Sequence, residues 1–305
     1  MKDRVLRAIT VDGGFRVIAA RTTALVQEAV RVQKVHGHDA QVFGELLTGA
    51  VLVRETMAPG HRVQAILSRE GRGTLIADSH PEPDPPTDPP PLSELAAQGT
   101  SAERAALTRG LVSRREDGVG LPIVSEGAVL KLIRSMPRGR LHQSIVEAGD
   151  GGINEAIMRY LQESAQVYAT LGIATVVEGD RVVASGGFIV QLLPELEDGP
   201  LAVMTERLAH DFEPLADILA EHDADASWLL GELLHGMDHE ILADGSLRWG
   251  CDCSQARVLG AIVTLGRDEL VEIVERGEVL ELTCEYCTRP WKIGAEQIRG
   301  LLTPS

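Results

Sequence analysis

All four cysteines of this chain lie in its last fifth, in two close pairs. The first pair is Cys251-Asp-Cys253, the second is Cys284-Glu-Tyr-Cys287, and residues 254–283 separate them. Four thiolates from two turns are the soft ligands that a tetrahedral zinc ion takes. Thiolates are also the groups that oxidants attack first. The pattern therefore predicts one zinc ion per chain in the reduced state, at a site that oxidation can dismantle.

Two other uses of the cysteines remain to be weighed. Standing disulfides need an oxidising compartment. No apolar run typical of a signal peptide follows Met1, and no stretch has the apolar length of a membrane span, so we expect a cytoplasmic chain with reduced thiols. A thioredoxin-like pair expects one CxxC that opens a helix after a strand. Here a CxC motif accompanies it and Thr288-Arg-Pro follows Cys287, which indicates a turn. A zinc-dependent thiol–disulfide oxidoreductase stays the alternative.

The charge of the chain is concentrated in one segment. The net charge is −16, and from Glu195 to Asp244 there are fourteen Asp or Glu against one Arg207. The remainder is close to neutral, so no basic nucleic-acid surface is expected. Residues 247–305 hold seven Arg or Lys against nine Asp or Glu, which disfavours a second alternative, a zinc-ribbon interaction module that binds nucleic acid.

The length of 305 residues and the patterning predict an α+β chain in three parts. These are an N-terminal mixed α/β domain over 1–195, an acidic helical linker over 196–246 and a small C-terminal zinc-binding domain over 247–305. Turn residues between apolar runs predict hairpins at 5–20, 63–78 and 173–193. Apolar spacing and capping predict helices at 23–35, 38–57 and 153–166. Seven prolines within 81–91 predict an extended loop.

Within the acidic segment, apolar residues keep helical spacing in two sets. The first set is Leu201, Met204, Leu208, Phe212, Leu215 and Leu219, and the second is Trp228, Leu229, Leu233 and Met237. Both predict amphipathic helices with acidic outer faces. Like charges repel each other, and Pro214 and Gly231 interrupt the pattern. We therefore expect a helical region of marginal stability.

Motifs of catalysis are missing from the sequence. There is no phosphate-binding glycine loop, no GxSxG and no readable set of acid, base and nucleophile, so the chain is not expected to be an enzyme. His235 and His239 have the spacing of a helical metal pair, but no Glu follows His235 directly, and a solvated helix face is favoured. Gly186-Gly187 indicates a close-packed strand. Tyr286 and Trp291 are expected to pack over the cysteine turns.

The cysteine pattern is similar to that of the heat-shock protein 33 family of redox-regulated chaperones. Two further motifs carry the resemblance: Tyr160-Leu-Gln-Glu-Ser164-Ala-Gln166, and Ser185-Gly-Gly-Phe-Ile-Val-Gln191-Leu-Leu-Pro194. The chain departs from the family over 81–107, where a Pro-rich segment precedes Arg109-Gly110 in place of a short turn. The departure concerns the local sheet topology and the dimer surface, but not the zinc motif.

The resemblance implies an ATP-independent holdase. In the reduced state Cys251, Cys253, Cys284 and Cys287 would bind one Zn²⁺, and the protein would be inactive. Oxidation would form the disulfides Cys251–Cys253 and Cys284–Cys287, release the metal, and unfold the zinc domain and the linker. Apolar surface would then bind unfolding client proteins and protect them from oxidative and heat aggregation. The implied partners are these clients and a second copy of the chain when oxidised, with no nucleic acid and no membrane.

Overall fold

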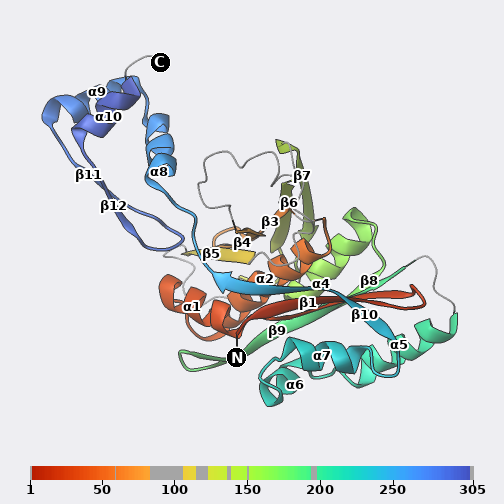
Figure 1. Ribbon diagram of the computed structural model, residues 1–305. Helices are drawn as coiled ribbons and strands as arrows, with labels where there is room; N and C mark the ends of the chain where they lie inside the picture. The colour runs from red at the N-terminus through yellow and green to blue at the C-terminus, as the bar shows by residue number, and fades with distance from the viewer. Residues whose placement is uncertain are drawn as a thin grey trace. The chain divides into compact units, whose positions relative to one another are not determined.

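The computed structural model describes residues 2–58, 60–82, 106–114, 123–135, 139–149, 151–193 and 198–302. The chain forms two compact units, Met1–Trp249 and Gly250–Ser305 (Figure 1). Most of the segment 81–107, where the sequence departs from the expected pattern, lies outside the described residues. So does Pro194, the last residue of the second motif.

The first unit is built on a 10-stranded sheet with the order β7-β6-β3-β4-β5-β10-β1-β2-β9-β8. Its strands are β1 (Arg4–Thr10), β2 (Phe15–Arg21), β3 (Arg62–Arg69), β4 (Gly73–Pro81), β5 (Ala106–Arg114), β6 (Val129–Ser135), β7 (Leu141–Glu147), β8 (Ala169–Glu178), β9 (Arg181–Leu192) and β10 (His239–Trp249). Neighbours are antiparallel, except that β10 and β5 run parallel over residues 247–249. The mixed α and β architecture expected from the sequence is confirmed.

The three predicted hairpins are present, as β1–β2, β3–β4 and β8–β9. Each turns at a glycine with a positive φ, namely Gly13 (73°), Gly71 (73°) and Gly179 (59°). Residues with a Cβ rarely adopt a φ in this range, which is why these turns carry glycine. In the first turn the Gly14 N–H also donates a hydrogen bond of 2.9 Å to Asp12 Oδ1.

One face of this sheet packs on α1 (Thr23–Gln33), α2 (Gly37–Glu55) and α4 (Gly152–Arg159), and α4 continues into a π-helical turn, Tyr160–Ser164. Helix α2 is apolar on most sides, which is typical of a helix enclosed by its neighbours. Thirteen of its residues are buried, among them Phe43, Leu46 and Leu47. The main core therefore lies between α2 and the sheet. Across the described residues, no helix has both the length and the apolar character needed to span a membrane.

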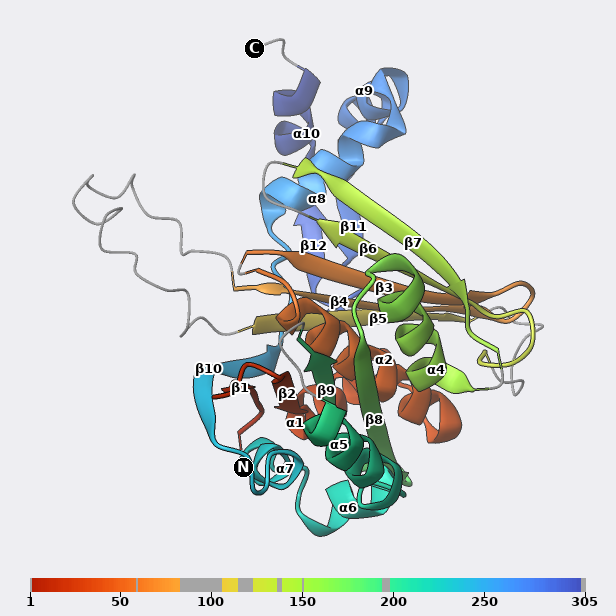
Figure 2. The same ribbon diagram turned by 90° about the vertical axis from the view of Figure 1, so that its right-hand side faces the viewer.

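The opposite face, at the β1-β2-β9-β8 end, is covered by α5 (Asp198–His210), α6 (Leu215–Glu221) and α7 (Ala226–Leu233), as Figures 1 and 2 show. These helices form the acidic layer. A second core lies beneath it, with side chains from both sides buried: Leu6, Phe15, Val17 and Phe188 from the strands, and Met204, Phe212, Leu229 and Leu233 from the layer. The apolar spacing in the acidic segment thus marks residues that face the sheet.

The bounds of these helices correct two expectations. The first apolar set belongs to two helices, because Pro214 precedes α6 as its N-cap and lacks the N–H that would continue α5. The second set does not extend to Met237, because α7 ends at Leu233. Residues 239–249 are strand β10, where no strand was expected. That strand pairs with β1 from Arg4 opposite Ser246 to Thr10 opposite His239.

The second unit is small. It contains α8 (Gln255–Ile262), a 3-10 turn (Val263–Leu265), α9 (Arg267–Arg276), the hairpin β11 (Leu280–Thr283) and β12 (Pro290–Ile293), and α10 (Ala295–Leu302). Among the described residues its core holds five buried apolar side chains, Ile262, Leu270, Ile273, Ile293 and Ile298. A core of this size contributes little stability without a further cross-link.

Candidate metal centre

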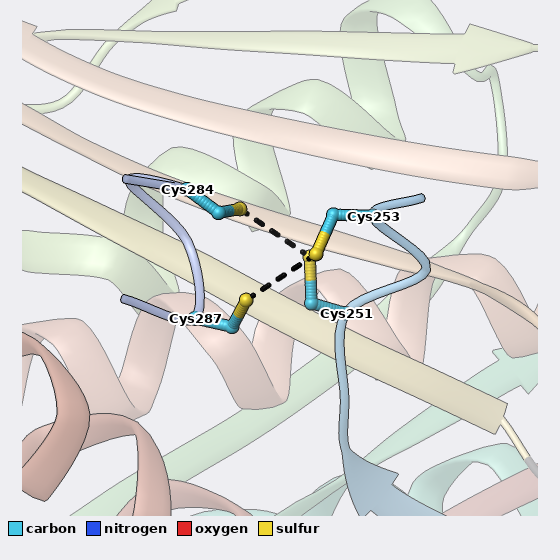
Figure 3. Close-up of side chains that lie close together, drawn as sticks. All are labelled: Cys251, Cys253, Cys284 and Cys287. Carbon is cyan, nitrogen blue, oxygen red and sulfur yellow. Dashed lines mark hydrogen bonds between the residues drawn. The ribbon is translucent and has the colours of Figure 1, made fainter. Parts of the chain in front are cut away.

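Two turns of the second unit bring the four cysteines together (Figure 3). The sulfur atoms of Cys251 and Cys284 are 3.8 Å apart, and those of Cys253 and Cys287 are 3.5 Å apart. All four sulfur atoms lie within 4.8 Å of one another, and all four side chains are half-buried. The spacing of the cysteines in the sequence predicted that these four residues form one site, and in the structure they lie close together.

The first pair lies between β10 and α8. Ser254 follows directly and is the N-cap of α8, where its hydroxyl accepts a hydrogen bond from the Arg257 N–H at 3.4 Å. Arg257 Nη1 also lies 2.5 Å from the Asp252 carboxylate, whose side chain is 10% exposed. Asp252 therefore fastens the first cysteine turn to the helix that follows. Sequence reasoning missed this role, although its position between two ligand residues was the available signal.

The second pair occupies the turn of the β11–β12 hairpin. The Cys284 N–H donates to the Arg289 carbonyl at 3.0 Å, and the Thr288 N–H donates to the Cys284 carbonyl at 2.7 Å. Thr288 has φ of 58°, which closes the turn tightly. Trp291 follows in β12 and is half-buried, with the Arg289 guanidinium 4.6 Å from its ring centroid. The aromatic ring thus braces the hairpin that carries this turn.

The surroundings of the cysteines shift the pKa values of their thiols in different directions. Burial raises the pKa of Cys284, but backbone N–H groups of Cys287 and Tyr286 point at its sulfur and bring the pKa below the ordinary thiol value. Burial raises the pKa of Cys253, and hydrogen bonding with Cys287 raises it further. Burial also raises the pKa of Cys287. Four crowded sulfur atoms cannot all carry negative charge without a cation among them.

The donor set and its spacing fit a tetrahedral metal ion. A zinc–sulfur bond of about 2.3 Å places tetrahedral ligand atoms about 3.8 Å apart. The sulfur separations of Cys253–Cys287 and Cys251–Cys284 are 3.5 and 3.8 Å, close to that value. Four thiolates without oxygen or nitrogen donors are typical of zinc or iron–sulfur sites. Cys251, Cys253, Cys284 and Cys287 can therefore hold one metal ion.

The remaining motif residues lie elsewhere. His235 and His239 are exposed to solvent, as expected, but they do not lie on a helix, because α7 ends before them and His239 begins β10. The close packing of Gly186 and Gly187 is confirmed, since an added Cβ would lie 2.6 Å from the Ala20 carbonyl and 2.3 Å from the Gly172 carbonyl, respectively.

The strand with the arginine–glycine pair resumes after the departing segment. Arg109 and Gly110 lie in β5, which pairs with β4. Arg109 Nε donates to Asp78 Oδ2 at 2.9 Å, and a Cβ on Gly110 would lie 2.6 Å from the Phe43 ring. The strands before and after the Pro-rich segment, β4 and β5, are therefore neighbours in the sheet.

This chain is similar over nearly its whole length to proteins that are named as chaperonins. The 33 kDa chaperonin of Syntrophotalea carbinolica is 27% identical over 99% of this chain and 100% of its own length. That of Symbiobacterium thermophilum is 30% identical (98% and 96%), and that of Microcystis aeruginosa is 31% identical (99% and 97%). These names support a chaperone rather than an enzyme.

A solved structure has the same fold. The crystal structure of the 33 kDa chaperonin of Thermotoga maritima superposes with a TM-score of 0.75 at 21% identity, over 99% of this chain and 98% of that one. The family profile described as Hsp33 protein matches residues 3–293. With the four clustered cysteines inside that match, the chain belongs to the Hsp33 family.

Proposed function

We propose that this protein is a redox-regulated, ATP-independent holdase chaperone of the cytoplasm. Its reduced form would hold one zinc ion and bind clients poorly, and its oxidised form would bind unfolding proteins. The observation that carries the proposal is the convergence of four cysteine sulfur atoms within 4.8 Å in a unit with a small core. Such a unit depends on its cross-link, so a change at the cysteines becomes a change in folding.

Zinc, when bound, would supply a cross-link between the two cysteine turns and keep the ligands as thiolates. The chain itself prepares the site. The backbone N–H groups of Tyr286 and Cys287 favour negative charge on the Cys284 sulfur. The contact of Asp252 with Arg257 holds the first turn on α8.

Oxidation would convert these ligands into disulfides. One thiolate attacks a peroxide oxygen and becomes a sulfenic acid as hydroxide leaves. Its neighbour then attacks that sulfur, forms the S–S bond and displaces a second hydroxide. Two electrons pass from each pair of sulfurs to one peroxide molecule. The disulfides Cys251–Cys253 and Cys284–Cys287 would leave no thiolate to bind metal.

The loss of the cross-link would spread to the acidic segment. We propose three functional parts: a chaperone core over 1–195, a redox-sensitive linker over 196–246 and the zinc switch over 247–305. The linker carries thirteen Asp or Glu against Arg207, so its helices repel one another at neutral pH. Its displacement would uncover an apolar face that includes Phe15, Val17 and Phe188. That face suits the exposed apolar segments of unfolding clients, and oxidised copies of the chain would pair as homodimers.

The first prediction tests the chaperone proposal itself. Light scattering of a thermally unfolding client should rise when the reduced protein is present. It should stay low when the protein has first been oxidised with peroxide at mild heat. The reason is that client-binding surface is covered in the reduced state. Insulin reduction measured on the same samples separates this activity from that of a thiol–disulfide oxidoreductase. Equal suppression by the reduced and oxidised forms would refute the switch.

The second prediction concerns disulfide pairing. Peptide mapping of the oxidised protein should find mainly Cys251–Cys253 and Cys284–Cys287, because residues close in sequence remain close as the unit unfolds. The folded geometry offers a competing outcome, since the sulfur of Cys251 lies 3.8 Å from that of Cys284. A majority of disulfides between the two motifs would mean that the cysteines pair before unfolding, contrary to the proposal.

A further inference from the structure

One buried arginine joins the acidic helical layer to the sheet. Arg21 is the last residue of β2 and is 5% exposed. Its Nε donates to the Asp223 carbonyl at 2.8 Å, and its Nη2 donates to Asp223 Oδ1 at 3.0 Å. Asp223 lies in the turn between α6 and α7. Two bonds from one planar group therefore grip a single residue of the layer.

Arg21 is itself held from the other side. Its Nη1 donates to Asp3 Oδ1 at 2.7 Å, and Asp3 is 5% exposed. The same carboxylate accepts hydrogen bonds from the N–H groups of Ala24, at 3.2 Å, and Leu25, at 2.6 Å, in the first turn of α1. A carboxylate at a helix N-terminus is favourably placed. The guanidinium is thus fixed in position before it contacts the layer.

The turn between α6 and α7, which Arg21 contacts, has an unfavourable backbone conformation. Asp223 and Ala224 both have φ of 50°, in the left-handed region that residues with a Cβ rarely adopt. Ala224 is 1% exposed and its N–H donates to the Leu219 carbonyl at 2.7 Å. Two successive residues in this conformation persist only where neighbours hold them. The bonds from Arg21 are part of that support.

We propose that Arg21 is a latch that holds α6 and α7 on the sheet and sets how readily the layer is displaced. The inference rests on the proposed function, in which displacement of this layer uncovers the client-binding face. Asp223 is the releasable side of the latch, because its side chain is 49% exposed, whereas that of Asp3 is 2% exposed. Water can replace the Asp223 bonds, while the Asp3 bond stays enclosed. Arg21 is a positioning residue, since its bonds are to the layer and to Asp3.

Asp223→Asn tests the latch with little change of shape. Asparagine tolerates the left-handed conformation but removes the charge that Arg21 pairs with. The matched control is Glu221→Gln, which makes the same charge change two residues earlier, at an exposed position with no ion pair to a described residue. Hydrogen exchange is measured on the reduced, zinc-bound, full-length protein. Exchange in 215–233 should become about fivefold faster in Asp223→Asn and stay unchanged in the control, since a partly exposed ion pair contributes modestly.

Arg21→Lys tests the other partner. Lysine keeps the charge but cannot make the three directed bonds of the guanidinium, so exchange in 215–233 should rise by about tenfold or more. A rise confined to α1, or equal rates in Asp223→Asn and Glu221→Gln, would overturn the latch and leave Arg21 as a support for α1 alone. If Arg21→Lys does not fold, Asp223→Asn decides, because it replaces a half-exposed side chain.

The client assay separates this inference from the proposed function. Asp223→Asn should need less oxidant than the unmodified protein to reach half of its full suppression of client aggregation. Faster exchange in 215–233, with no suppression by either protein after oxidation, would support the latch and contradict the chaperone proposal. Suppression of client aggregation by both oxidised proteins, with no change of exchange in 215–233 of Asp223→Asn, would support the chaperone proposal and contradict the latch.

Discussion

Removal of the proposed zinc ion from the reduced protein should unfold residues 250–305, displace the acidic linker over 196–246 and leave the scaffold over 1–195 folded. The core of the second unit consists of five buried side chains among the described residues. A core of that size rarely supplies more than about 3–5 kcal/mol. Structural zinc in small modules contributes about 10–16 kcal/mol, and that binding energy is folding energy. Without the cross-link the balance therefore turns against the folded state.

Tryptophan emission can follow this unfolding. Trp291 belongs to the second unit, and its half-buried ring faces Arg289, so unfolding should move its emission to longer wavelength. A chelator added at constant reductant concentration should cause this shift of the emission. Zinc added back should reverse it. Cys284→Ser should behave as the chelated protein does, whereas Thr283→Ser, an exposed neighbour, should not. Zinc loss without any emission change would show that the unit stays folded on its own core.

Local sequence signals were sufficient where the structure is local. The hairpin at Gly13 and the long helix α2 follow from turn residues and apolar spacing, since both depend on neighbours in sequence. The clustering of the four cysteines was also predictable. Each pair of cysteines is carried by one turn, and two such turns have few ways to share an ion.

Strand β10 was not predictable in the same way. Ile241 and Leu242 are adjacent and both about half exposed, so the segment lacks the alternation of a half-buried strand. Its pairing with β1 joins residues more than two hundred positions apart, as Arg4 with Ser246. The same holds for Arg21 and Asp223, whose contact depends on the packed layer. Sequence patterns carry no information on such pairs without the fold.

The two cores support the proposal that a stable scaffold carries an acidic layer that can be displaced. The core around α2 encloses that helix on most sides. The acidic layer, by contrast, packs through one face of three short helices. Short helices are marginal on their own and depend on the face that they bury. Disruption of that face should therefore displace the layer before the scaffold unfolds.

Leu229→Asp should give a protein that suppresses client aggregation while reduced and zinc-bound. Leu229 is fully buried between α7 and the sheet. A carboxylate there loses the burial of a leucine and gains an unpaired buried charge, which together cost about 4 kcal/mol or more. The layer can avoid this cost by leaving the sheet, because water then solvates the new charge. The cysteines are untouched, so the metal should stay bound.

The matched control is Ser227→Asp, which places the same charge on the exposed side of the same helix. It should leave the reduced protein inactive and its thermal unfolding nearly unchanged. Client light scattering and zinc content are measured on both variants, with far-UV circular dichroism to show that the strands persist. Activity of reduced Leu229→Asp with one zinc per chain would place the client-binding surface beneath the acidic layer. An inactive reduced variant whose 215–233 amides exchange freely would show that the uncovered face does not bind clients, and the binding surface would have to lie in the zinc unit itself.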